Sequence, residues 1–181
     1  MRLVLIVFLT IIGFSFGEEK KDIATFEVSD STYPSVKVVY DWNLASPEEV
    51  SKALNFLRNH FKAYSEYAPL EEVEIVVVSH GAEIPIFAKQ NKEIFKETVE
   101  RIKNFHDMYG VKFYVCYNAA KAFGFDKEDL PSFVILTPAG VAKLAALQED
   151  GYRLVPAIVH DFKPIKEKYG KKQQKKEEKS K

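Results

Sequence analysis

Short runs of β-branched and aromatic residues constrain the fold of this chain more than any other feature of its sequence. Three of them are almost uninterrupted: Val36–Trp42 (VKVVYDW), residues 73–78 (VEIVVV) and residues 111–116 (VKFYVC). Runs of this length and character are typical of strands that are covered on both faces of a sheet. Residues 133–136 and 152–158 carry a weaker form of the same pattern. The sequence therefore predicts five strands.

Segments with helical periodicity separate these runs. The first predicted helix opens at a capping box from Ser46 to Glu49, with Pro47 at the first helical position. Its apolar residues recur at spacings of three and four, namely Val50, Ala53, Leu54, Leu57, Phe61 and Tyr64. A second long helix is expected between Asn91, as its N-terminal cap, and Gly110, which suits a left-handed stop.

The remaining connections are also predicted to be helical. Short helices are expected over residues 82–88 and 118–125, and a last helix opens at residues 137–138 and ends at Gly151. Alternating strands and helices favour right-handed crossovers between parallel strands. The predicted fold class is α/β, a three-layer α/β/α sandwich around a five-stranded, mainly parallel sheet. Ligands bind such sheets at the edge where the carboxyl ends of the strands meet.

The chain of 181 residues divides into four parts. We expect a signal peptide at residues 1–17, a polar linker at 18–35, the folded domain at 36–162 and a Lys-rich disordered tail at 163–181. The tail holds nine Lys and three Glu, whereas residues 18–162 hold 16 Lys plus Arg against 23 Asp plus Glu. This negative body argues against a groove for nucleic acid. The tail is interpreted as a solubilising end, with a contact to anionic lipid or to an acidic partner as the alternative.

The N-terminal segment has the features of an export signal. Arg2 supplies positive charge, an apolar stretch follows, and Ser15 to Gly17 places small residues before a cut expected after Gly17. The apolar stretch is short for a bilayer span, although an uncleaved anchor is the alternative. We therefore expect a periplasmic or secreted protein with no transmembrane span after cleavage.

Five residues at the predicted strand ends are candidates for a site. Cys116 ends a strand just before a helix, where backbone N–H groups and the helix dipole stabilise a thiolate. The alternative for this residue is a small buried hydrophobe. His80 is a candidate base or ion-pair partner for the thiol, or else a strand-end histidine bonded to a loop. Gly81 leaves room for a ligand or for unusual backbone angles, while Asn118 and Asn43 are candidate binding residues on the same edge.

Other motifs with a known chemistry are missing from the sequence. One cysteine and four scattered histidines show no paired metal-ligand spacing, and His60, His106 and His160 are interpreted as surface or core residues. Glycine-rich nucleotide motifs and a GxSxG motif are also missing. We therefore expect neither a metal nor a cofactor.

Three stretches resemble the DsrE/DsrF-like family of sulfur-relay proteins, which includes the TusD-type carriers. They are IVVVSHGAEI at 75–84, FYVCYNAAKAFGFDKEDL at 113–130 and TPAGVAKLAALQEDGYRLVPA at 137–157. The resemblance implies a five-stranded parallel sheet, assembly into trimers or hexamers, and a persulfide on Cys116. The best-known relay members are cytoplasmic, whereas this chain carries an export signal, so its sulfur donor and acceptor are unknown.

Two functional hypotheses follow. The first is an exported sulfur carrier, and with it a sulfurtransferase activity, that holds sulfane sulfur on Cys116, with His80 and Asn118 assisting. The second is a non-catalytic, oligomeric module that binds a small ligand or mediates assembly through the same strand-end crevice. A thiol redox enzyme is a weaker third, because a lone cysteine needs an external thiol for resolution.

Overall fold

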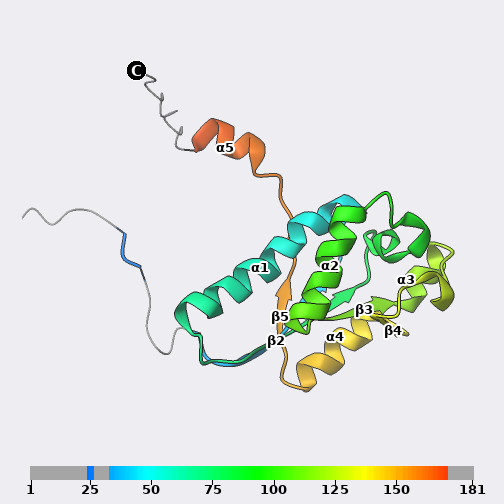
Figure 1. Ribbon diagram of the computed structural model, residues 1–181, viewed down its shortest axis with the longest axis horizontal. Helices are drawn as coiled ribbons and strands as arrows, with labels where there is room; N and C mark the ends of the chain where they lie inside the picture. Colours follow the sequence, from blue (N-terminus) through cyan, green and yellow to red (C-terminus); the bar gives the residue numbers. More distant parts are fainter. Residues whose placement is uncertain (1–23, 27–32, 171–181) are drawn as a thin grey trace, which may run out of the picture.

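The computed structural model describes residues 24–26 and 33–170. Its sheet has five strands: β1 (Val36–Trp42), β2 (Val73–Ser79), β3 (Lys112–Cys116), β4 (Val134–Thr137) and β5 (Arg153–Pro156). Their order across the sheet is β4-β3-β2-β1-β5, and every neighbouring pair is parallel (Figure 1). The predicted fold class is therefore confirmed. The predicted signal peptide and residues 171–181 of the tail lie outside the described residues.

Helices connect consecutive strands as expected. They are α1 (Val50–Tyr67), α2 (Lys96–Tyr109), α3 (Tyr117–Ala122), α4 (Gly140–Glu149) and, after the last strand, α5 (Lys163–Tyr169). Short 3-10 turns occupy Pro47–Glu49, Ile84–Phe87, Lys89–Asn91 and Lys127–Asp129. Within the described part of the chain, no helix has both the length and the apolar character needed to cross a bilayer.

One face of the sheet packs against α1 and α2. Side chains alternate between the faces of a strand, and on this side Trp42 and Phe113 are completely buried, with their ring centroids 6.0 Å apart. Helix α1 buries Leu54 and Leu57 against them, at the spacing that the sequence predicts. This face carries most of the hydrophobic core of the domain.

The opposite face is covered by α4 alone. Val39, Val76 and Val78 contact Leu144 and Leu147 of this ten-residue helix. The outer strands of this face stay partly open, since Ile135 and Leu154 are exposed. The two helical layers of the sandwich are therefore unequal.

Two of the predicted helix starts are wrong in their details. Asn91 does not cap α2: it ends a 3-10 turn, and its side-chain nitrogen donates to the Pro85 carbonyl at 2.9 Å, while α2 begins at Lys96. Ser46 precedes its helix but makes no side-chain capping bond, and Glu49 accepts a hydrogen bond from the Ala45 N–H instead. Such local bonds compete with the predicted caps for the same side chains.

The predicted helix ends agree better with the structure. Gly110 follows α2 in the left-handed conformation, with φ of 68°, and Gly151 follows α4 with φ of 87°. Residues without a Cβ adopt these angles at little cost.

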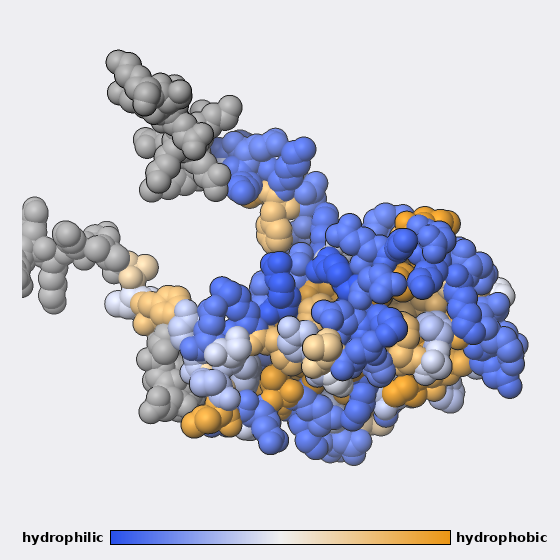
Figure 2. Space-filling model, viewed as in Figure 1, coloured by the Kyte–Doolittle hydropathy of each residue, from blue (hydrophilic) through white to orange (hydrophobic). Residues whose placement is uncertain are grey.

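The segment expected to be a disordered tail begins with a helix. Residues 163–169 form α5, which extends away from the layered body (Figure 1). Its surface in Figure 2 is mostly hydrophilic, with a small hydrophobic patch near the point where the segment leaves the body. The predicted tail is thus structured over its first seven residues.

Candidate functional site

The carboxyl ends of β1 and β2 bring Asp41 and His80 together. The two strands are neighbours, with Asp41 opposite Val78 and Trp42 opposite Ser79. The backbone N–H of His80 donates to the Trp42 carbonyl at 3.0 Å, and its Nε2 lies 2.7 Å from Oδ1 of Asp41. An ionised carboxylate only accepts, so the proton of this bond belongs to Nε2. Asp41 therefore orients the imidazole of His80.

Cys116 lies at the end of the adjacent strand β3. Its side chain is 8% exposed, and it directly precedes α3, for which it is the N-cap residue. On the other side of β3, Cys116 pairs with Thr137 of β4. The thiol thus lies on the predicted edge of the sheet, just beneath the surface of the isolated chain.

Gly140 brings His80 and Cys116 next to the start of α4. A Cβ atom added to Gly140 would lie 2.6 Å from the Cβ of His80 and 3.3 Å from the Cβ of Cys116. A contact of 2.6 Å is too close for any side chain, so only glycine fits here without a shift. No pattern in the sequence marks Gly140, because its role depends on how α4 packs.

The start of α4 gives this site a positive potential. The first N–H groups of a helix have no carbonyl partner within it, and the helix dipole adds partial positive charge there. No acidic residue occurs in the first turn of α4 to offset that charge. Positions beside Gly140 are therefore suited to an anionic atom.

Glu83 fixes the loops beneath the site. It is completely buried, and its Oε1 accepts from the Ser79 hydroxyl at 2.5 Å and from the Gly81 N–H at 3.1 Å. Its Oε2 accepts from the Leu44 N–H at 2.9 Å. One carboxylate therefore ties the end of β2 to the loop after β1. An acidic residue four positions after a buried strand end was the only signal for it in the sequence.

The role expected for Gly81 differs in the structure. A Cβ there would lie 2.5 Å from Oε2 of Glu83 and 2.7 Å from the backbone nitrogen of Leu44. The space beside Gly81 is thus filled by this protein's own atoms, and its φ is not positive. Glycine is needed for the close packing of two loops.

The two predicted asparagines lie at the rim of the site. Asn118 has an exposed side chain on α3, and its backbone N–H donates to the Pro138 carbonyl at 3.4 Å, which links the loops after β3 and β4. Asn43 is exposed in the loop after β1. The structure thus brings His80 and Cys116 together, with Asn118 two residues after the thiol in the chain.

The other histidines have structural partners or are exposed. Nδ1 of His60 lies 3.0 Å from the Tyr40 hydroxyl, and Nδ1 of His106 lies 3.1 Å from the Val111 carbonyl. Burial lowers the pKa of His60 and raises the pKa of Tyr40 to about 12. His160 is exposed after β5. Among the described residues, no group of His, Cys, Asp and Glu side chains is arranged to hold a metal ion.

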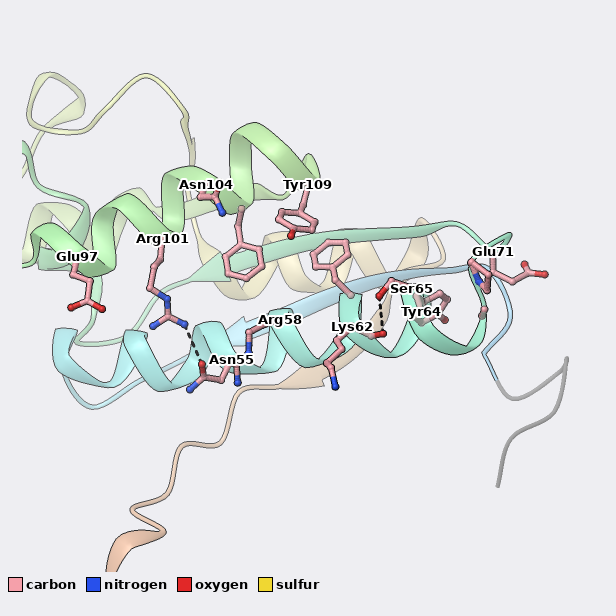
Figure 3. A pocket seen from close by; sticks show the side chains of 14 residues that line it. Asn55, Arg58, Lys62, Tyr64, Ser65, Glu71, Glu97, Arg101, Asn104 and Tyr109 are labelled. Atoms are coloured by element: carbon pink, nitrogen blue, oxygen red, sulfur yellow. Dashed lines mark hydrogen bonds between the residues drawn. The ribbon is translucent and has the colours of Figure 1, made fainter. Parts of the chain in front are cut away.

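A separate groove of about 820 Å³ lies between α1 and α2 (Figure 3). Aromatic side chains line it, together with Arg101, whose guanidinium donates to Ser51 and to Asn55. None of the predicted site residues contributes to this groove. Arg101 is engaged in structural bonds and the residues that line the groove include no thiol, so we place the candidate site at the strand ends.

A family model and two solved structures are similar to this chain. The sequence model of the DsrE/DsrF-like family matches residues 45–156. A solved structure of MTH1491, a protein of unknown function from Methanobacterium thermoautotrophicum, is similar with a TM-score of 0.53 and 23% identity, over 67% of this chain and 99% of that chain. A second one, BT1422 of unknown function from Bacteroides thetaiotaomicron, has a TM-score of 0.38 and 14% identity, over 66% of this chain and 93% of that one. No curated protein matches the chain.

Proposed function

Since this chain belongs to the DsrE/DsrF-like family, for which a sulfur-relay type of function is suggested, we propose that it carries sulfane sulfur as a persulfide on Cys116. The observation that supports this most directly is the position of the thiol. Cys116 and His80 both lie against Gly140, and His80 is itself paired with Asp41. A carrier needs a nucleophilic sulfur, a group that takes up its proton, and donors for the negative terminal sulfur.

In the proposed loading step, a polysulfide is the sulfur donor. His80 takes the proton of the Cys116 thiol, and Asp41 stabilises the resulting imidazolium. The thiolate attacks a terminal sulfur of the polysulfide and forms a new S–S bond on Cys116. The S–S bond that joined this sulfur to the rest of the polysulfide breaks, its electron pair stays with the leaving polysulfide, and that polysulfide is shorter by one sulfur with its charge unchanged. Transfer to an acceptor thiolate reverses this step, so neither direction consumes an external oxidant or reductant.

The start of α4 supports the charged product. The persulfide ends in a negative sulfur, and the free N–H groups of the first helical turn lie beside Gly140. In this proposal Asn118 assists from α3. The lone cysteine also suits a carrier, because no second thiol in the chain can release the sulfur by forming a disulfide.

Mass spectrometry after incubation with polysulfide tests this function. The wild type should gain the mass of sulfur on Cys116, and Cys116→Ala should gain none. Asp41→Asn and His80→Gln should load at least about tenfold more slowly, as expected when an acid–base group is lost. His160→Gln, at an exposed position outside the site, is the matched control and should load like the wild type. Equal labelling of the wild type and Cys116→Ala would refute the proposal.

The burial of Cys116 favours a second candidate. At 8% exposure the thiol has the environment of a structural cysteine, and the same edge would then bind a small anionic ligand without covalent chemistry. Iodoacetamide separates the two functions. A carrier is alkylated in its folded state within minutes, whereas an inert Cys116 reacts only in denaturant.

We further propose that the protein acts after export, with residues 1–17 removed and as a homo-oligomer. The support is the sequence of the N-terminal segment and the family resemblance alone. Intact mass of the protein isolated from its host should correspond to a chain that begins at Glu18. A mature chain that still begins at Met1 would contradict cleavage.

A further inference from the structure

The segment that follows β5 leaves the domain next to the candidate site. Strand β5 pairs with β1, and the Ala157 N–H donates to the carbonyl of Asp41 at 3.0 Å. From there the chain runs through exposed residues into α5, which stands apart from the sheet and its covering helices (Figure 1). The segment that carries α5 therefore leaves the domain at the edge that carries His80 and Cys116.

One face of α5 is apolar and exposed. Phe162, Ile165 and Tyr169 follow one another at spacings of three and four, which places them on one side of a helix. They are 69%, 58% and 71% exposed. Ile158, just before the helix, is 60% exposed as well. A single exposed apolar residue is ordinary, but a helical face made only of such residues indicates an interaction surface.

Lysines flank this apolar face. Lys166 and Lys168 lie on either side of it by helical periodicity, and Nζ of Lys168 is 4.9 Å from the ring centroid of Tyr169. The sequence then continues to residue 181 with six more Lys and two Glu. From residue 163 onward the chain therefore has a surplus of about six positive charges, in contrast to the negative body.

The apolar face of α5 and the lysines beside it together indicate which kind of partner the segment binds. A nucleic acid would pair with the lysines and leave Phe162 and Ile165 in water. An apolar groove on a protein would bury the ring and the aliphatic chain but not the cations beside them. The surface of an anionic bilayer satisfies both, since apolar side chains enter the boundary of headgroups and acyl chains while lysines remain at the phosphates.

We propose that residues 158–170 bind the surface of an anionic lipid bilayer, with Phe162, Ile165 and Tyr169 as the inserted face. Bound in this way, the segment holds the strand-end edge of the domain near the membrane. The proposal concerns the placement of the protein and does not depend on sulfur chemistry at Cys116. A short inserted face binds weakly by itself, so the basic residues supply a large part of the affinity.

Sedimentation of the full chain with lipid vesicles tests the proposal. Vesicles that contain phosphatidylglycerol should bind the wild type at low salt, and vesicles of phosphatidylcholine alone should bind much less. The double variant Phe162→Ser, Ile165→Ser should lower the partition coefficient on the anionic vesicles at least about tenfold. Lys166→Glu with Lys168→Glu should lower it by a similar factor and weaken its dependence on salt.

Two controls keep the test specific. Met108→Ser removes an apolar side chain of similar exposure, 74%, from the end of α2, and should bind like the wild type. Because the apolar residues 1–16 are the same in all variants, only the difference between variants reports on α5. Equal binding of the wild type and both double variants would overturn the proposal. Binding to a DNA duplex that does not respond to Phe162→Ser, Ile165→Ser, without preference for anionic vesicles, would overturn it too.

Discussion

The two faces of the sheet differ in how much core they bury and in what chemistry they hold. Among the described residues, the face under α1 and α2 belongs to a cluster of 21 buried side chains, while the face under α4 has five. Asp41, His80 and Cys116 lie on the thinly covered side, because each is two residues beyond a side chain packed on α4. The first turn of α4, and not a layer of large apolar side chains, covers the site on that face.

The difference between the two faces shows that most of the stability comes from one face and that the candidate reactive groups lie on the other. The thick layer buries the large residues whose transfer from water stabilises the fold. The thin layer holds Asp41 and His80 only partly buried, with side chains 25% and 15% exposed, so these polar groups keep contact with water beside the thiol. Substitutions on the two faces should therefore separate effects on folding from effects on the site.

The largest effect should come from truncating the core under α1. Leu54→Ala opens a cavity at a completely buried position and should lower the free energy of unfolding by about 3–4 kcal/mol. Leu144→Ala, its counterpart on α4, is 7% exposed and should cost about 2 kcal/mol. Urea denaturation measures both, and equal costs would mean that the two layers are equally tight.

Removing the carboxylate of Glu83 should have the next effect. Glu83→Ala leaves the buried Ser79 hydroxyl and the N–H of Leu44 without their acceptor, at a cost of about 2–3 kcal/mol. Glu83→Gln keeps one acceptor oxygen and should cost less. If both variants unfold at the urea concentration of the wild type, Glu83 does not hold the loops of the site.

A methyl group at Gly140 should disturb the site more than the fold. Gly140→Ala forces His80 and the start of α4 apart, which should cost about 1–2 kcal/mol and change the alkylation rate of Cys116 several-fold. Val141→Ala, at a neighbouring position that is 66% exposed, is the control and should change stability by less than about 0.5 kcal/mol. If the alkylation rate of Cys116 is unchanged in Gly140→Ala, the packing of α4 does not influence the reactivity of Cys116.

The smallest effect should be a pH dependence of the free energy of unfolding that arises from His60 on α1. Burial lowers the pKa of His60 in the folded state, so the unfolded chain binds its proton first as the pH falls. The stability linked to His60 is therefore complete above its ordinary pKa of 6.5 and decreases as the pH falls through 6.5 and below. Urea midpoints between pH 7 and 5 should fall more steeply for the wild type than for His60→Gln. Parallel pH profiles would show that His60 is not the group concerned.

Elements with a strong local pattern could be predicted from the sequence. The bounds of β1 agree residue by residue, since its apolar run ends at the proline and polar residues on either side. The caps at Asn91 and Ser46 could not be predicted in this way. The side chain of Asn91 is bonded to the Pro85 carbonyl, and Glu49 binds the N–H of Ala45 rather than that of Ser46. Helix α5 was missed because its short, charged sequence resembles the rest of the tail.

The sequence by itself determined the class of the fold and the edge that carries Cys116 and His80, because hydrophobic periodicity is local and parallel strands end on one side. Only the tertiary structure decided which groups meet at that edge. Asp41 reaches His80 because β1 and β2 are neighbours, and Gly140 reaches both His80 and Cys116 because α4 crosses the thinly covered face. Strand order and helix packing depend on contacts between residues far apart in the chain, and a local pattern does not record them.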